Sequence, residues 1–190
     1  MKTKFTLFIL SIFVLSSCTN IMFETSMPKD VRVMSKFPRK VVGSYYDGKK
    51  DTLVITKKTF TYGKSKNSML ISGSLDKDEA ELKKLNSFYY LNLKKSDGYW
   101  TVFPFQLTDE GLDVYYILME ELIDRLDTSK TTQERENEII SAISYITAVY
   151  PMTKPDSKDK EYLVSPTNEE FEELMKQGYF VKIGGFKRLK

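Results

Sequence analysis

The sequence predicts an α+β fold in which an antiparallel β-meander, curved into a sandwich or a half-barrel, carries helices on its flanks. Two observations predict it. Between residues 41 and 117 apolar and polar residues mostly alternate, and glycine-containing turns interrupt the alternation. Between residues 118 and 177 apolar residues recur at helical spacing, and residues 179–188 then return to a strand pattern.

The alternation predicts seven strands, with turns between them. Asp47-Gly48 and Asp97-Gly98 are turn signals, because glycine readily adopts positive φ. Pro104 cannot donate a hydrogen bond to a ladder, so the strand that contains it should lie at an edge or carry a bulge. The strands are expected at residues 41–46, 52–57, 59–63, 68–72, 88–95, 99–107 and 112–117.

Helical spacing and capping signals predict the helices. Asp76 followed by Glu79 has the spacing of a capping box and indicates a helix over residues 77–86. Two amphipathic stretches follow, near residues 118–127 and 134–148, and a short strand is expected at Tyr162–Val164.

The last helix, near residues 166–177, has two candidate starts. Either Ser165 is its N-cap, or Thr167 is, with Glu170 completing a capping box. Gly178 should end the helix. The final strand, residues 179–188, should contain a bulge at Gly184-Gly185.

Composition excludes several kinds of chemistry. The chain has 190 residues, which is long enough for one folded domain with its own core. Its 41% hydrophobic and 29% charged residues are typical of a folded protein. It has no histidine and one cysteine, which excludes a Ser-His-Asp triad, a Cys-His pair, a His-ligated zinc site and an intrachain disulfide. The acidic run from Asp76 to Glu81 lacks EF-hand spacing. No catalytic residue, metal or cofactor is therefore predicted, and we do not expect an enzyme.

The first 18 residues have the pattern of a cleaved export signal. Met1–Lys4 is basic, and Phe5–Leu15 is an apolar run of 11 residues, too short to span a membrane. The run ends in Leu15-Ser16-Ser17-Cys18, an aliphatic residue and two small residues before the only cysteine. The alternative is an ordinary secretory signal that ends near a buried cysteine.

The segment Leu15-Ser16-Ser17-Cys18 resembles the lipobox of bacterial lipoproteins. The resemblance implies cleavage before Cys18, acylation of its thiol and amine, and anchoring in the cell envelope by the acyl chains. Thr19 in place of aspartate implies the outer membrane, on its periplasmic or surface side, if the cell is Gram-negative. Downstream, the chain is loosely similar to small lipoproteins of unknown activity in Bacteroidetes-type bacteria.

Three parts of the chain are therefore expected: a signal peptide at residues 1–17, a lipidated cysteine with a solvated tether at residues 18–38, and one domain at residues 39–190. The precursor has a net charge of +3, and loss of Lys2 and Lys4 would lower it by two units, to +1. Such a balance gives no field that would attract a nucleic acid.

The aromatic meander leaves three interpretations of its face open. Tyr90 and Trp100 could form an exposed pair that binds a glycan or an envelope protein, and they are our candidate binding face. The meander could instead be a lipocalin-like half-barrel whose interior aromatics hold a small apolar ligand. The aromatics could also simply pack the core.

We expect a lipid-anchored binding or interaction module of the cell envelope. The alternatives are a carrier of a small apolar ligand and a hydrolase that uses only carboxylates.

Overall fold

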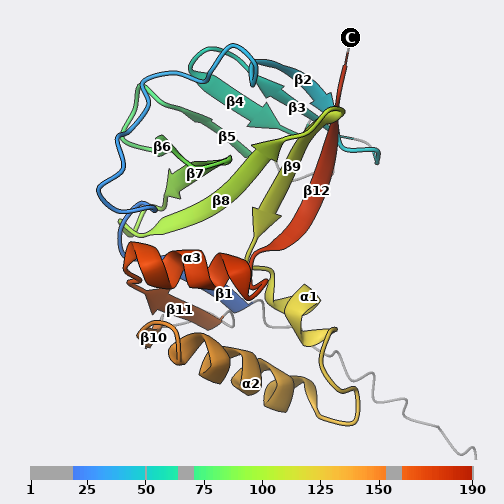
Figure 1. The fold of residues 1–190 in the computed structure, drawn as a ribbon. Helices are drawn as coiled ribbons and strands as arrows, with labels where there is room; N and C mark the ends of the chain where they lie inside the picture. Colours follow the sequence, from blue (N-terminus) through green and yellow to red (C-terminus); the bar gives the residue numbers. More distant parts are fainter. Residues whose placement is uncertain (1–18, 50, 64–70, 153–159, 190) are drawn as a thin grey trace, which may run out of the picture.

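The computed structural model describes residues 19–49, 51–63, 71–152 and 160–189, which form twelve strands and three helices (Figure 1). The helices are α1 (Met119–Ile123), α2 (Thr132–Ser144) and α3 (Asn168–Lys176). The strands are β1 (Thr19–Phe23), β2 (Gly43–Tyr46), β3 (Thr52–Ile55), β4 (Thr59–Tyr62), β5 (Ile71–Ser74), β6 (Ala80–Leu85), β7 (Phe88–Lys94), β8 (Trp100–Leu107), β9 (Gly111–Tyr116), β10 (Val149–Met152), β11 (Lys160–Val164) and β12 (Val181–Arg188).

All the strands belong to one mixed sheet that branches at β8. The main path runs β10-β11-β1-β8-β9-β12-β2-β3-β4-β5, and β7 and β6 extend from the other side of β8. Only the β1–β11 pair is parallel among the pairings of the described residues. The sheet is not closed, and helices flank it, so the predicted α+β class is confirmed.

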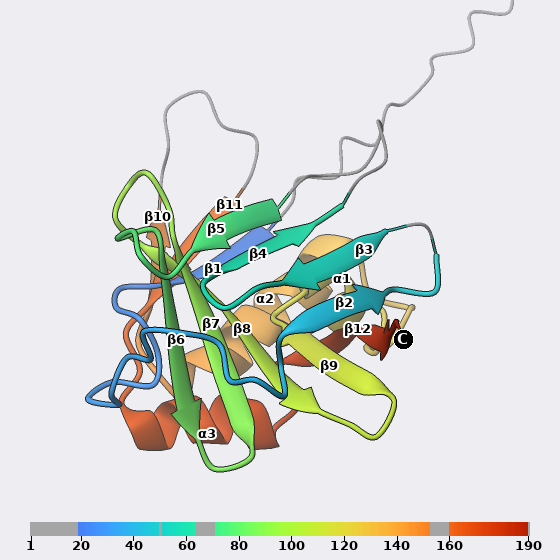
Figure 2. The ribbon, with the colours of Figure 1, turned by 90° about the horizontal axis from the view of Figure 1, so that it is seen from above.

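The strands β2–β9 and β12 curve into what we call the cup. Figure 2 shows β2–β5 lying across from β6–β9, as in a half-barrel. Figure 1 shows α3 beneath the cup, with α2 beyond β1, β10 and β11. Two buried clusters result. The cup core, which includes Ile55, Phe60 and Phe105, lies inside the cup. The helix-side core, which includes Tyr90, Val102 and Phe171, lies between the helices and β1, β11 and the outward faces of β7, β8 and β12.

The helix expected over residues 77–86 is wrong, because this segment contains strand β6, which pairs antiparallel with β7 from Ala80↔Leu93 to Leu85↔Phe88. Ala80 and Leu82 are buried in the cup core, which gives the strand a period of two. Asn86, with a φ of 54°, is the first residue of the two-residue turn between β6 and β7. Tertiary pairing thus overrides the capping signal at Asp76.

The solvated tether expected over residues 18–38 is wrong for Thr19–Phe23 and for the buried Met27 and Phe37, whereas Cys18 lies outside the described residues. Thr19–Phe23 forms β1, which pairs with β11 along its whole length and with β8 at Phe23↔Trp100. Ile21, Met22 and Phe23 are each at most 2% exposed. A strand buried on both faces is a continuous apolar run without alternation, so the periodicity did not reveal it.

The other elements fall close to their expected places. Residues 68–70 of the expected strand 68–72 lie outside the described residues, and β5 begins at Ile71. Helix α1 is shorter than expected, and β10 was not foreseen. Of the two candidate starts for α3, the Thr167 N-cap with Glu170 is confirmed. Gly178, with a φ of 77°, follows the C-cap of α3.

Pro104 lies in a strand that has partners on both sides. β7 pairs with β8 from Trp100 to Phe105, so β8 is not an edge strand. On its other side β8 meets β1 only at Trp100 and β9 only from Phe105 onward. Pro104 therefore sits in the stretch where this second side has no ladder partner among the described residues, which a residue without an N–H tolerates.

Candidate binding site

Tyr90 and Trp100, the predicted binding face, lie in the helix-side core, so this prediction is wrong. Tyr90 is 4% exposed, and its ring centroid lies 5.6 Å from that of Phe171 in α3. Trp100 is 9% exposed, with Lys94 Nζ 5.5 Å from its ring centroid. The alternation along β7 and β8 was predicted correctly, but the face that carries Tyr90 and Trp100 is the one that the helices cover.

The opposite face of the same strands lines an apolar pocket of about 160 Å³ inside the cup. On β3, β4, β7, β8 and β9, side chains two residues apart line it, and β5 and β12 contribute further residues. The lining residues are Phe37, Leu53, Ile55, Phe60, Tyr62, Ile71, Leu91, Leu93, Phe103, Phe105, Leu112, Val114, Ile183 and Phe186. Among them, only Tyr62 has a polar side-chain atom, so a polar ligand group would find few partners here.

The strand sequences build this pocket by alternation and by one close approach. Leu53 and Ile55 point inward, whereas Val54 between them points to the other face of β3. A Cβ at Gly73 would lie 2.7 Å from Phe60 Cζ, so glycine at this position makes room for the Phe60 ring. The Phe60 ring therefore lies directly against the backbone of β5 while it lines the pocket.

A bulge in β12 shapes the mouth of the pocket. The register between β12 and β9 shifts between Lys182 and Gly184, so Ile183 is the extra residue. The bulge predicted at Gly184-Gly185 is thus confirmed, with its extra residue one position earlier. Ile183 is 42% exposed and also lines the pocket.

A second, more polar hollow of about 340 Å³ adjoins this mouth. It shares Tyr62, Ile183 and Phe186 with the apolar pocket. The Tyr62 hydroxyl donates to Asp47 Oδ2 at 2.9 Å. Burial and the neighbouring Asp47 carboxylate raise the pKa of Tyr62 to about 12, so this hydroxyl remains protonated at neutral pH.

Charges of both signs surround the hollow. Lys182 Nζ lies 2.7 Å from Asp113 Oδ1, and this hydrogen bond raises the pKa of Lys182. Asp47 and Lys49 also line the hollow. The rim therefore has no dominant sign that would select an anion or a cation.

The size of the apolar pocket limits what it can hold. A dry cavity of about 150 Å³ accommodates one benzene ring. Pockets that enclose a whole drug-sized molecule usually exceed about 300 Å³. A pocket of about 160 Å³ can therefore take one aromatic ring or a short alkyl segment, with the rest of the ligand outside.

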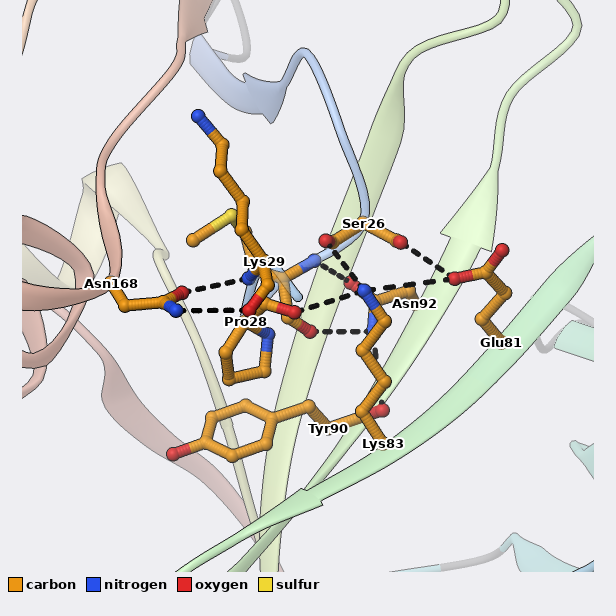
Figure 3. Close-up of polar contacts among 9 residues, drawn as sticks. Ser26, Pro28, Lys29, Glu81, Lys83, Tyr90, Asn92 and Asn168 are labelled. Carbon is orange, nitrogen blue, oxygen red and sulfur yellow. Dashed lines mark hydrogen bonds and ion pairs between the residues drawn. The ribbon is translucent and has the colours of Figure 1, made fainter. Parts of the chain in front are cut away.

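A buried polar cluster lies elsewhere, where residues 26–29 cross β6 and β7 (Figure 3). The Asn92 side chain, 0% exposed, accepts from Met27 N at 2.7 Å and donates to Met27 O at 2.8 Å. Lys83 Nζ donates to the carbonyl oxygens of Ser26 and Pro28, each at 2.9 Å. Burial lowers the pKa of Lys83, although Glu81 opposes this.

A second amide repeats this arrangement closer to the surface. Asn168 of α3 accepts from Lys29 N at 2.7 Å and donates to Lys29 O at 2.9 Å. Each asparagine therefore makes two hydrogen bonds with the backbone of a single residue, Asn92 with Met27 and Asn168 with Lys29. The cluster fastens residues 26–29 to the domain, and we assign it a structural role.

No family model, curated protein or solved structure matches this chain. Among the described residues, no helix is long and apolar enough to cross a bilayer. In the same part of the chain, no three or more Cys, Asp or Glu side chains gather where they could hold a metal ion. What the pocket can bind is therefore judged from its own size and chemistry.

Proposed function

We propose that this chain is a lipid-anchored binding module of the cell envelope whose cup takes up one apolar group of its ligand. The observation that carries the proposal is the apolar pocket of about 160 Å³. Protein interiors are normally close-packed. An apolar ligand group that entered the pocket would remove its own apolar surface and that of the lining from water, which is favourable.

The small volume of the pocket supports a module that holds part of a ligand rather than a carrier that encloses all of it. Burial of one phenyl-sized group contributes roughly 3 kcal/mol, which by itself corresponds to a dissociation constant of several millimolar. Tighter binding would need further contacts outside the pocket. The pocket lining, as far as the structure describes it, contains no carboxylate, which gives no support to a hydrolase that uses two acids.

The anchor is proposed from the lipobox and from where the folded chain begins. β1 starts at Thr19, whose hydroxyl donates to Glu136 Oε1 at 2.9 Å. Glu136, 6% exposed, also pairs with Lys160 Nζ at 2.7 Å. Acyl chains on Cys18 would thus be joined to the sheet with no intervening linker, and two or three chains anchor a protein stably.

Filling the pocket should weaken binding of a small aromatic probe. We expect fluorobenzene to bind the wild-type protein with a dissociation constant near the millimolar range, measured by ¹⁹F NMR. Leu53→Trp places a large ring in the pocket and should weaken binding at least tenfold. Leu93→Phe, a smaller filling change, provides a second test if Leu53→Trp does not fold.

The matched control is Val54→Trp, which adds the same ring to the opposite face of β3. It should leave the affinity within about twofold of the wild-type value. Equal binding by Leu53→Trp and Val54→Trp would contradict the pocket as the binding site.

The anchor has its own test. Cys18→Ala should release the protein from membranes or leave it uncleaved, because the only thiol available for acylation is lost. Metabolic labelling with a radioactive fatty acid measures this directly, with the wild-type chain as the positive control. Incorporation of label into the Cys18→Ala protein would refute the lipobox interpretation.

A further inference from the structure

Next to the pocket, one edge of β12 has no strand partner among the residues that the structure describes. β12 pairs with β9 from Val181 to Lys187, but with β2 only at Lys187 and Arg188. The cause is the early end of β2 at Tyr46, where the turn that contains Gly48 begins. On the side of β2, residues 181–186 therefore have no ladder partner among the described residues. In Figure 1, β12 lies beside β9 and meets β2 only at its upper end.

The free edge, the polar hollow and the apolar pocket adjoin one another. The hollow of about 340 Å³ is lined by Lys182–Phe186 of β12 and, across from them, by Asp47, Lys49 and Tyr62. Ile183 and Phe186 also line the apolar pocket. A chain that lay along the edge in the hollow could therefore direct a side chain into the pocket.

The side chains along this edge leave its backbone accessible. Gly184 and Gly185 have no side chains, and glycine in a strand often marks the close approach of another backbone. Lysine on an edge strand normally discourages pairing. Here Lys182 is held at 2.7 Å by Asp113 of β9, on the side away from the free edge.

We propose that the free edge of β12 binds an extended polypeptide segment as an added strand, and that the pocket takes one phenylalanine-sized or leucine-sized side chain of that segment. This inference rests on the proposed function and names the ligand class. Main-chain hydrogen bonds to an edge supply affinity in such complexes, and pockets for alternate side chains supply specificity. The volume of about 160 Å³ fits one such side chain.

The probes are short synthetic peptides. The first has about seven residues, threonine and lysine with one central phenylalanine, and blocked ends. It should bind the full chain at least tenfold more tightly than N-acetylphenylalanine amide, because only the peptide can pair with the edge. Alanine in place of the phenylalanine should cost at least tenfold, as should Leu53→Trp in the protein.

N-methylation of the peptide separates strand pairing from simple adhesion. Alternate amides of a strand point to opposite sides, so methyl groups on one alternate set should weaken binding at least tenfold and those on the other set should not. Hydrogen exchange provides the readout on the protein. The peptide should slow exchange of amides within Val181–Phe186, whereas fluorobenzene should not.

Three results would overturn the inference. The first is a peptide that binds no more tightly than N-acetylphenylalanine amide, which leaves the proposed function intact. The second is an equal effect of both methylated sets. The third is a dimer in analytical ultracentrifugation that the peptide does not dissociate, which would assign the edge to a second copy. If neither fluorobenzene nor the peptide binds, the proposed function fails as well.

Discussion

Tyr90→Ala is expected to lower the free energy of unfolding by about 3–5 kcal/mol, the range for removal of a large buried aromatic. Tyr90 packs against Phe171 and Phe88, with ring centroids 5.6 Å and 6.2 Å away. Helix α3 cannot shift to close the gap without disturbing its own contacts, because Phe171 also packs against Phe23 and Phe180. In a chain of this size the melting temperature should fall by roughly 10 °C.

Two controls identify the cause of this loss. Tyr90→Phe keeps the buried ring and should stay within about 1.5 kcal/mol of the wild-type stability. Tyr145→Ala removes the same side chain where it is 89% exposed, and it should change stability by less than about 0.5 kcal/mol. Urea unfolding followed by circular dichroism measures all three. If Tyr90→Ala were as stable as Tyr145→Ala, Tyr90 would be a surface residue, as the candidate binding face required.

Asn92→Ala is expected to destabilise the fold by about 2–4 kcal/mol. It removes the partners of Met27 N and Met27 O, and each buried group left unsatisfied costs about 1–3 kcal/mol. The Met27 amide should then exchange with solvent much faster, which hydrogen exchange can follow. We expect residues 24–38 to loosen before the strands of the cup.

Asn168→Ala is the matched comparison for this prediction, since Asn168 makes the same pair of hydrogen bonds with Lys29. Asn168 is only partly buried, so water can replace its bonds, and the loss should be about 1 kcal/mol. Equal losses for the two variants would mean that burial does not set the strength of these contacts.

The alternating pattern predicted β7, β8 and β9 correctly, because the side chains on the two faces of each strand have different surroundings. Tyr89 and Phe105 lie in the cup core, whereas Tyr90 and Val102 lie in the helix-side core. The sequence of one strand cannot tell which face a distant helix will cover. Residues 166–177 were correctly predicted as a helix, but nothing local indicated that this helix packs against Tyr90.

Of the three strands that were not predicted, β1, β6 and β10, the first two were missed for different physical reasons. β1 lies between β11 and β8, and its continuous apolar run resembles the end of an export signal more than an alternating strand. β6 carries a capping signal before it, but its pairing with β7 decides its structure. β1 pairs with β11, which is distant in sequence, and β6 becomes a strand because it pairs with β7.

The pocket could be predicted in part. Leu53, Phe60 and Phe105 share the inward periodicity, and the expected half-barrel already allowed an apolar interior. The free edge of β12 could not be predicted, because it results from the unequal lengths of β2 and β12 in the assembled sheet. An edge that is unpaired because the neighbouring strand is shorter leaves no signal in the sequence of either strand.

The central claim is that the cup contains a site for one apolar group. Methyl-resolved ¹³C NMR of the wild-type protein during titration with fluorobenzene tests it most directly. The account predicts shifts confined to methyl groups that line the pocket, such as those of Leu53, Ile71 and Val114, with Leu122 and Ile143 of the helix-side core unchanged. Shifts confined to Leu122 and Ile143, or no saturable shift at all, would contradict it.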